Sequence, residues 1–477
     1  MSTHTQSDFT LVRGLGIIAA TSIVVGNVIG TGVFLKSRVM TCNVGTPGRV
    51  IAVWVVAGIL SIAGALTYAE LAAIWPRAGG EYVFIRNAYN ARLAFLYGWM
   101  RFFVASAGSL AALAVGFAIF LNVLLRGTLN ITFFTVPIPD YPVPFGGLQA
   151  VALLAIAVVT VVNCASVSVG GSFASALTAL KVGIILALGV GTIVFANGDW
   201  SHFLSEDAGG QCEGVAAAAR GGSAGFAAAM LGALWAYNGW NEMTFVSGEV
   251  KNPQRNIPYA LVVGMVIVCG LYVFLNATYF YVLTPTEIAN VSATSSVASV
   301  VAERFLGPIA VSLIAAAMLT STFGALHIST MASSRVPFAM ARDGLFVQSL
   351  GRVSDRTHVP IRALMAQGVW ASVLALSGSY DTLTDYVIFA NWIFFGLVIA
   401  SVFIIRRRMP AVERVYRAWG YPLVPALFLL TTAWLLITTL LTAPKRSLIG
   451  IGLVALGLPV YYYQVRRAGR KADSRKY

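Results

Sequence analysis

The stretch Val25-Gly26-Asn27-Val28-Ile29-Gly30-Thr31-Gly32-Val33-Phe34 places three glycines and two small polar residues in the middle of an apolar segment. A membrane helix can be interrupted there only where other groups satisfy the freed backbone N–H and C=O groups, because hydrocarbon offers no hydrogen bonds. A bound ligand is one such group. The alternative is that Gly26 and Gly30, four residues apart, form a small-residue seam against a neighbouring helix. The stretch by itself leaves both interpretations open.

Composition indicates a polytopic membrane protein. Of the 477 residues, 58% are hydrophobic and 10% are charged, and the mean hydropathy is +0.80. Such values exclude an ordinary soluble protein of this length. The polar first ten residues carry Asp8 and lack the pattern of a cleaved secretory signal, so we expect the first apolar run to remain as a helix.

The apolar runs predict an all-α protein with twelve transmembrane helices, because a spanning helix needs about 20 apolar residues. The runs lie near residues 13–36, 50–74, 93–125, 147–165, 172–196, 225–248, 258–283, 308–338, 361–378, 383–405, 422–443 and 447–465.

The positions of lysine and arginine predict the orientation, since short cytoplasmic loops retain positive charge. With the N-terminus inside, 23 of the 32 such residues, Arg101 among them, fall on the cytoplasmic side, and Lys181 lies within a span. We therefore expect both termini to be cytoplasmic, the basic tail 466–477 included. The net charge of +14 then reports topology, and no nucleic-acid partner is expected.

The four cysteines show no metal-ligand spacing, and we expect no metal or cofactor. Cys42 and Cys212 both fall on predicted outer loops and could pair. Two separate thiols are nevertheless the expected state for an arbitrary pair of cysteines.

A second apolar stretch with a built-in break is Leu234-Trp235-Ala236-Tyr237-Asn238-Gly239-Trp240-Asn241-Glu242, in the sixth predicted span. Its polar residues are costly in a membrane helix unless they face a cavity or one another. The first and sixth spans are five apart, so two five-helix halves with matching breaks predict an inverted repeat with a binding site at mid-depth. This spacing favours a ligand site at Gly30. The predicted parts are an N-terminal tail, two repeats, a final helix pair and the basic tail: 1–12, 13–196, 225–405, 422–465 and 466–477.

Several motifs, in order, resemble the amino acid, polyamine and organocation (APC) transporter superfamily. Within it the chain is most similar to the L-amino-acid transporter branch, which includes the light chains of heteromeric exchangers and their bacterial relatives. Besides the two breaks, the motifs are Tyr68-Ala69-Glu70-Leu71, Pro76-Arg77-Ala78-Gly79-Gly80-Glu81-Tyr82, Glu249-Val250-Lys251-Asn252-Pro253, Ser333-Ser334-Arg335, Ala341-Arg342-Asp343-Gly344 and Asn391-Trp392. The resemblance implies the LeuT-like fold, with broken helices 1 and 6 in a 5+5 inverted repeat.

The resemblance also implies a substrate site at the two breaks. In relatives the α-carboxylate of an amino acid rests on the first break, against groups that match Gly30, Thr31 and Gly32. Exposed amides at the start of a half-helix attract an anion, which agrees with this assignment. The α-ammonium is met by freed carbonyls, which match Val28, Ile29, Trp235, Ala236 and Asn238.

Three residues of the sixth span bear on gating and specificity. Trp235 matches a bulky aromatic that closes over the substrate from outside. Asn238 matches a position where some relatives that handle cationic substrates carry an acid, so the amide here favours neutral amino acids. Glu242 leaves two alternatives open, a cavity-facing group for a cationic side chain or a proton, or a polar contact with another helix.

Lys181 lies about ten residues into the fifth span, roughly 15 Å along the helix axis, too deep for its ammonium to reach the headgroups easily. In sodium-independent relatives a lysine of this span takes the place of a bound sodium ion, and Lys181 matches it. Ser329 matches a serine that contacts this lysine. The resemblance therefore implies sodium-independent transport.

Taken together, the sequence predicts a secondary transporter that moves L-amino acids, neutral ones foremost, across the plasma membrane, taken here as a bacterial inner membrane. Exchange and facilitated transport are the expected modes. The alternatives are a proton-coupled symporter of cationic or broad-range amino acids and a sensor without net transport. The outer loop 126–146 lacks the cysteine that joins light chains to a heavy chain, so we expect no covalent heavy subunit. An enzyme is not expected, because Gly221-Gly222-Ser223-Ala224-Gly225 matches the nucleophile elbow without the strand that the elbow requires.

Overall fold

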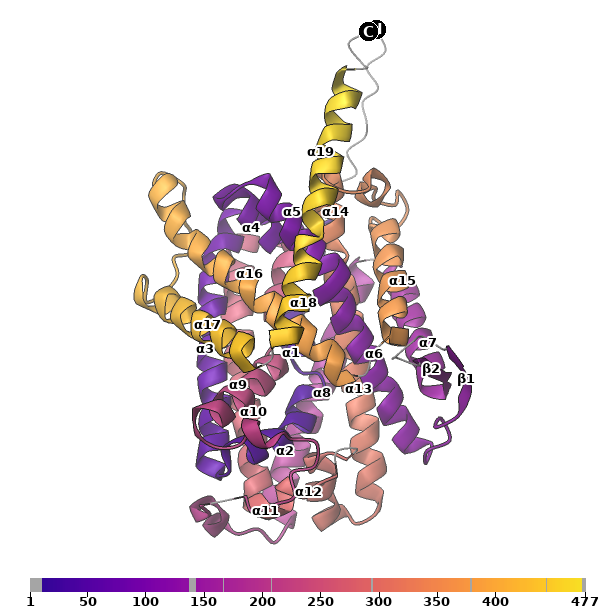
Figure 1. Ribbon diagram of the computed structural model, residues 1–477, viewed down its shortest axis with the longest axis vertical. Helices are drawn as coiled ribbons and strands as arrows, with labels where there is room; N and C mark the ends of the chain where they lie inside the picture. Colours follow the sequence, from indigo (N-terminus) through magenta and orange to yellow (C-terminus); the bar gives the residue numbers. More distant parts are fainter. Residues whose placement is uncertain are drawn as a thin grey trace.

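The computed structural model describes residues 11–136, 143–165, 167–206, 208–292, 295–377, 380–442 and 444–473. It is a bundle of long helices that run mostly along one direction (Figure 1). The helices of the first half are α1 (Ile17–Val28), α2 (Gly32–Val44), α3 (Pro47–Ile74), α4 (Glu81–Ala88), α5 (Ala91–Met100), the π-helical η1 (Arg101–Ala105), α6 (Ser106–Leu124), α7 (Gly147–Asn163) and α8 (Val167–Phe195).

The second half begins with short 3-10 turns in the loop that follows α8. Its helices are η2 (Trp200–Leu204), η3 (Ala217–Ala219), α9 (Gly222–Ala236), the 3-10 helix η4 (Trp240–Glu249), α10 (Pro253–Val282), α11 (Pro285–Ala289), α12 (Val297–Leu306), α13 (Ile309–Ser333), α14 (Arg335–Arg342), η5 (Gln348–Gly351), α15 (Ile361–Ser377), α16 (Tyr380–Arg408), α17 (Leu423–Thr442), α18 (Pro444–Ala455) and α19 (Gly457–Asp473).

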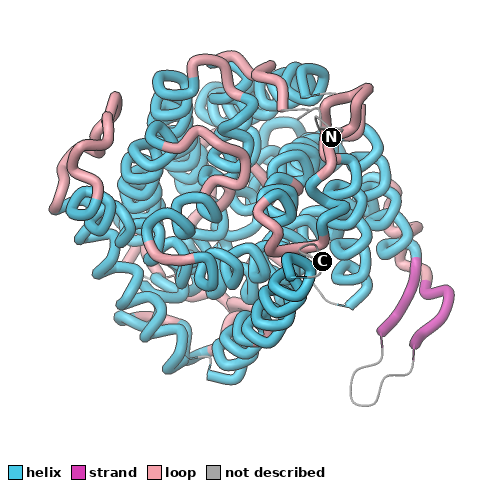
Figure 2. Tube along the Cα trace, turned by 90° about the horizontal axis from the view of Figure 1, so that it is seen from above, coloured by secondary structure: helices cyan, strands magenta, loops and turns pink. Residues whose placement is uncertain are grey.

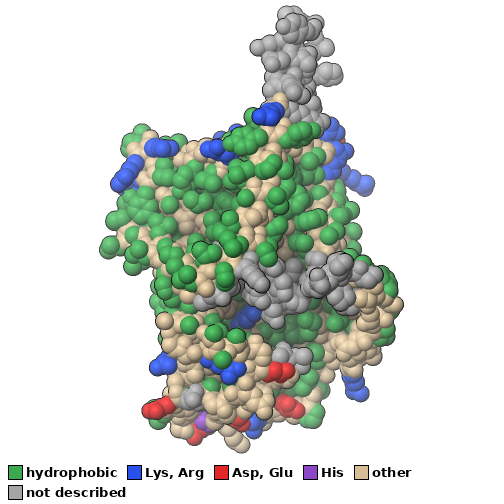
Figure 3. All heavy atoms as spheres, in the orientation of Figure 1, with side chains coloured by type: hydrophobic (Ala, Val, Ile, Leu, Met, Phe, Trp, Pro, Cys, Tyr) green, Lys and Arg blue, Asp and Glu red, His purple; other side chains and the backbone are tan. Residues whose placement is uncertain are grey.

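The protein is an integral membrane protein by the length and composition of its helices. Eight helical segments within the described residues are long and apolar enough to cross a membrane. The other four predicted runs coincide with the shorter apolar helices α7 and α15, with the interrupted pair α9 and η4, and with α16. Hydrophobic side chains cover a broad area of the face shown in Figure 3, and most of the visible charge lies toward the two ends of the molecule.

Helix starts follow local sequence rules. The hydroxyl of Thr46 accepts a hydrogen bond from the Arg49 N–H, and Pro47 occupies the first turn of α3, where its missing N–H is not needed. Proline likewise begins α10, whose 30 residues pack along α3. These two long helices form one wall beside the broken segments.

Both predicted breaks are present. The first apolar segment leaves helical geometry between Val28 and Gly32, and the sixth does so between Ala236 and Trp240, where Gly239 has a φ of +111°. A φ in this range is a conformation that glycine adopts without the strain of a Cβ atom. The breaks lie against each other, because a Cβ atom on Gly32 would meet Ala236 and one on Gly239 would meet Asn27. Figure 2 shows the helical bundle from above, with the two strands at its edge.

Two features of the connections between helices differ from the sequence prediction. A two-stranded antiparallel sheet, β1 (Thr132–Val136) and β2 (Val143–Gly146), interrupts the otherwise helical chain. Cys42 and Cys212 form a disulfide, so the expectation of two separate thiols is wrong. The physical reason is that Ala289 and neighbouring apolar side chains bury both cysteines in one small cluster, with their Cα atoms 5.6 Å apart.

Candidate functional site

A cavity lies between the two breaks, and its walls contain most of the predicted site residues. It is small, because the space inside it that can hold the centre of a water molecule is about 30 Å³. The lining residues are Asn27, Val28, Gly30, Thr31, Gly32, Ser109, Leu113, Trp235, Ala236, Asn238, Gly239, Glu242 and Ser329. Of the predicted substrate-binding residues, only Ile29 is absent from this lining.

The three glycines of the first break have different neighbours. A Cβ atom on Gly26 would lie 2.0 Å from the Thr178 hydroxyl, so this glycine packs tightly against α8. A Cβ atom on Gly32 would lie 2.5 Å from the Ala236 Cα, so Gly32 lets the two breaks approach. Gly30 has only ordinary contacts, the nearest at 3.7 Å, and lines the cavity. Close packing against a neighbour therefore applies to Gly26 and Gly32, whereas Gly30 faces the cavity.

The N-terminus of α2 faces the cavity through Thr31 and Gly32. The N–H groups of a first helical turn have no partner further back in the helix, and they carry the positive end of its dipole. The Gly30 N–H is already engaged, since it donates to the Val28 carbonyl at 2.8 Å. The anion-binding groups that this geometry offers are thus the start of α2 and the Thr31 side chain.

A tyrosine that sequence reasoning missed bridges the two breaks. The Tyr272 hydroxyl, from α10, lies 2.9 Å from the Val28 carbonyl and 3.0 Å from the Ala236 carbonyl. These are two of the carbonyls assigned to the α-ammonium. A carbonyl oxygen accepts two hydrogen bonds. The Val28 oxygen already accepts from the Gly30 N–H as well, so the Ala236 oxygen is the one of the two that keeps a position for a further donor. The only sequence signal for this role would have been a polar group in the middle of an apolar run.

Trp235 and Asn238 sit on the second break. Trp235 is 8% exposed, lines the cavity, and is the last residue but one of α9 before the break. Its carbonyl accepts from the Asn238 N–H at 3.0 Å, so local turn geometry uses one of its two acceptor positions. Asn238 lines the cavity beside it.

Lys181 is buried at 1% exposure and braces the first break from α8. Its ammonium donates to the Gly26 carbonyl at 2.6 Å and to the Ile29 carbonyl at 2.8 Å. Ser321, on α13, donates to the same Ile29 oxygen at 3.0 Å. A fixed cation therefore satisfies the carbonyls that the interrupted helix leaves free.

The serine predicted to accompany Lys181 is a different one. Ser329 lies two turns further along α13, and its hydroxyl is 2.9 Å from Asn27 Oδ1 and 2.9 Å from Glu242 Oε2. The sequence pattern selected the right helix but the wrong turn, because Ser321 and Ser329 share one face at a spacing of about two helical turns.

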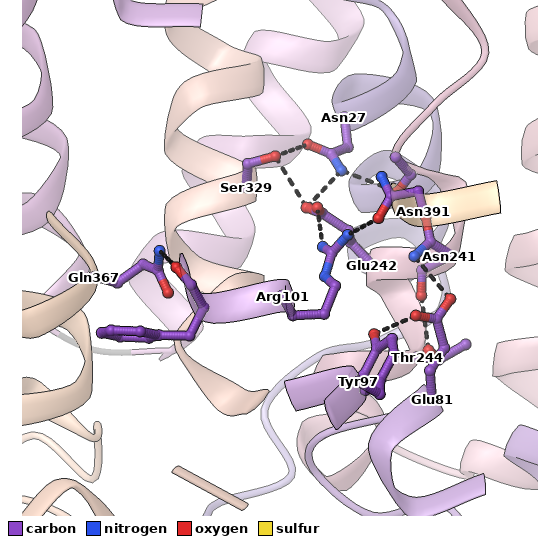
Figure 4. Close-up of polar contacts among 12 residues, drawn as sticks. Asn27, Glu81, Tyr97, Arg101, Asn241, Glu242, Thr244, Ser329, Gln367 and Asn391 are labelled. Atoms are coloured by element: carbon purple, nitrogen blue, oxygen red, sulfur yellow. Dashed lines mark hydrogen bonds and ion pairs between the residues drawn. The ribbon is translucent and has the colours of Figure 1, made fainter. Parts of the chain in front are cut away.

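A polar cluster lies behind the second break (Figure 4). Arg101 Nη2 donates to Glu242 Oε1 at 2.8 Å, and the side chains of Arg101 and Glu242 are 2% and 4% exposed. Asn27 Nδ2 donates to Glu242 Oε2 at 2.9 Å and to the Gly239 carbonyl at 2.9 Å. Arg101 also donates to Asn391 Oδ1 at 3.0 Å. One carboxylate thus joins both broken segments to α13 and η1.

The structure corrects the position that the charge pattern predicts for Arg101. The positive-charge pattern predicts a cytoplasmic position for this residue, whereas the structure buries it as the first residue of η1, with its guanidinium 4.8 Å from the Phe245 ring centre. A π-helical turn of this kind is frequent at functional sites. Burial of an arginine requires a partner, and Glu242 supplies it.

The described residues hold no group of three or more His, Cys, Asp or Glu side chains that could bind a metal ion. The polar groups around the cavity are instead helix ends, hydroxyls, amides and one neutralised carboxylate. This set suits a small zwitterion, because a helix start can bind an anion and carbonyl oxygens can accept from an ammonium group.

Comparisons with known proteins agree on one family. A family model described as "Amino acid permease" matches residues 15–456. Large neutral amino acids transporter small subunit 2 of Oryctolagus cuniculus is 30% identical over 474 residues, covering 95% of this chain and 81% of the relative. The b(0,+)-type amino acid transporter 1 of Homo sapiens is 28% identical over 456 residues, covering 95% of this chain and 88% of the relative.

Proposed function

Because this chain belongs to the amino acid permease family, we propose that it is a secondary transporter that binds neutral L-amino acids in the cavity between its two breaks. The relatives named above are amino acid transporters by their own names. The observation that carries the proposal is the meeting of a helix start, at Thr31 and Gly32, with the carbonyl groups of both breaks around one cavity.

The proposed pose follows from charge. The α-carboxylate rests on the start of α2, within reach of the Thr31 hydroxyl, and the α-ammonium faces the Val28 and Ala236 carbonyls. Both ends of the zwitterion then meet partial charges of the backbone, so no side-chain charge has to be buried for them. Trp235 at the rim closes the site from outside.

The proposed architecture has twelve spans, arranged as two inverted five-helix repeats over 13–196 and 225–405, followed by the helix pair over 422–465. Alternating access moves these repeats around the central site. Both termini lie in the cytoplasm, which fits the lysine and arginine side chains that Figure 3 shows along the end near α19.

We further propose that transport is independent of sodium. An ammonium group at Gly26 and Ile29 supplies the positive charge that a sodium ion would bring to these carbonyls. Uptake measured at fixed potential and pH is expected to be unchanged when external sodium is replaced by choline. A requirement for sodium would contradict this assignment.

Counterflow in liposomes tests the function. The purified protein is reconstituted, and uptake of radiolabelled L-leucine and L-alanine is compared between vesicles preloaded with the unlabelled amino acid and empty vesicles. Accumulation only after preloading indicates exchange, and equilibration without preloading indicates facilitated transport. Accumulation driven by an imposed pH gradient would identify the alternative, a proton-coupled symporter. Binding without any of these fluxes would identify a sensor.

A further inference from the structure

Glu242 lines the cavity, yet its charge is already matched from behind. Its carboxylate is the only acidic group on the cavity wall within the described part of the chain. Arg101 reaches the rear oxygen at 2.8 Å but is not part of the lining. An acid at a substrate cavity would ordinarily attract a cationic side chain. Here Arg101, which belongs to the protein itself, already pairs with that carboxylate.

The hydrogen bonds of Glu242 fix this arrangement. Asn27 and Ser329 both lie 2.9 Å from the second carboxylate oxygen. Arg101 is held in turn by Asn391, at 3.0 Å, on α16. Neither charged group can turn away without breaking contacts to other helices, so the pair stays closed in this geometry.

The local charge balance points to Glu242 as the counter-ion of Arg101. Glu81, at the start of α4 in the connection between α3 and α5, lies close to the same guanidinium. Its carboxylate contacts Tyr97 and accepts from Asn241 at 2.9 Å. Burial raises the pKa of the Glu81 carboxyl, and the ion pair at 2.8 Å joins Arg101 to Glu242. Asn391 is uncharged, so the cluster formed by Arg101, Glu242 and Asn391 is close to neutral overall.

We infer that Arg101 sets the charge specificity of the site, because it neutralises Glu242 and thereby excludes amino acids with cationic side chains. A lysine or arginine side chain in the cavity would lose its hydration and find no free counter-charge. A neutral side chain of the same length has no charge to dehydrate and needs no counter-charge. The inference rests on the proposed function, which supplies the amino acid at this cavity.

The most direct variant is Asn391→Asp. It keeps the volume of the side chain and places a second carboxylate on the same guanidinium, so the cluster gains one negative charge while every group stays in place. We expect the affinity for L-lysine to rise at least tenfold, with little change for L-norleucine, its uncharged analogue of similar length. Equilibrium binding of both radiolabelled compounds to monodisperse purified protein measures this ratio.

Arg101→Gln is the second variant, and it removes the masking charge outright. L-lysine affinity is again expected to rise at least tenfold. Loss of one partner from a buried ion pair is destabilising, so this variant is compared at matched monodispersity with Arg101→Gln/Glu242→Gln. The double variant has no charge to expose and is expected to remain selective for L-norleucine.

The outcomes separate the two proposals. Failure of the wild-type protein to bind L-norleucine, L-leucine or L-alanine overturns the proposed function. Wild-type binding of these compounds without a gain for L-lysine in Asn391→Asp or Arg101→Gln overturns the role of Arg101 alone. An equal gain in the double variant also overturns it, since the gain would then not arise from the Glu242 charge. Equal wild-type affinity for L-lysine and L-norleucine would do the same.

Discussion

The two breaks interrupt their helices at similar depth but are stabilised by different means. The first is held through its backbone, because Lys181 and Ser321 donate to the carbonyls that the interruption frees. The second is held largely through side chains, because Asn27 bonds the Gly239 carbonyl and Glu242 anchors the cluster behind it. A buried cation therefore supports the first break, together with the hydroxyls of Ser321 and Tyr272, whereas a charged pair and its hydrogen bonds support the second.

This difference predicts the largest effect at Lys181. Lys181→Ala removes this buried donor from the Gly26 carbonyl, at a cost of roughly 1–3 kcal/mol for an unsatisfied group, and leaves the Ile29 carbonyl with Ser321 as its donor. We expect amino acid exchange in proteoliposomes to fall by about two orders of magnitude. Ser321→Ala, which removes a donor from the same oxygen but no charge, should lose less than about fivefold. Full exchange activity in Lys181→Ala would show that the first break does not need the Lys181 ammonium.

The contact between the breaks is tested next, at Gly32. Gly32→Ala puts a Cβ atom against Ala236, where overpacking costs roughly 1–3 kcal/mol. A lower melting temperature and about tenfold slower exchange are expected. Gly30→Ala is the matched control, because its Cβ atom has ordinary contacts at 3.7 Å or more and should leave the melting temperature unchanged. The comparison fails if both variants melt alike.

Thr31 distinguishes the first break as the anion-binding one. Thr31→Val keeps the shape of the side chain and removes its hydroxyl, and a hydrogen bond to a charged group contributes roughly 1.5–3 kcal/mol. L-leucine affinity should therefore weaken by about tenfold or more, measured by equilibrium binding. Thr192→Val, whose hydroxyl bonds its own helix at the Leu188 carbonyl, should bind as wild type does. Unchanged affinity in Thr31→Val would take this residue out of the site.

The smallest effect is expected at Tyr272, which links the two breaks. Tyr272→Phe removes one hydroxyl shared by the Val28 and Ala236 carbonyls, worth roughly 0.5–1.5 kcal/mol. Affinity should change by about two- to tenfold. Tyr279→Phe is the control on the same helix, since the Tyr279 hydroxyl is buried without a hydrogen-bond partner among the described residues. Equal effects of the two variants would argue against a link through Tyr272.

Sequence reasoning identified both breaks and most of the cavity lining because glycine and polar residues are rare signals in apolar runs. It singled out Lys181, which the structure buries against the first break, for the same reason. It missed Tyr272, since an aromatic residue in a membrane helix is usually read as packing. It also misplaced Arg101 among the loops, because charge counting assigns arginine to the surface unless a partner is known.

The remaining differences depend on tertiary contacts. Ser321 and Ser329 have equivalent helical positions in the sequence, and only the height of the Ile29 carbonyl selects Ser321. The pairing of Cys42 with Cys212 joins residues 170 positions apart, and no spacing rule predicts it. In each case the sequence gives the residue type, and the packing of separate helices gives its partner.

The most direct test of the account is equilibrium binding of radiolabelled L-leucine to Gly30→Leu. A Cβ atom at Gly30 fits without a clash, and the added side chain would fill the cavity between the breaks. We predict a melting temperature close to that of the wild type and no measurable binding. Wild-type affinity in this variant would show that the amino acid binds elsewhere and would contradict the central claim.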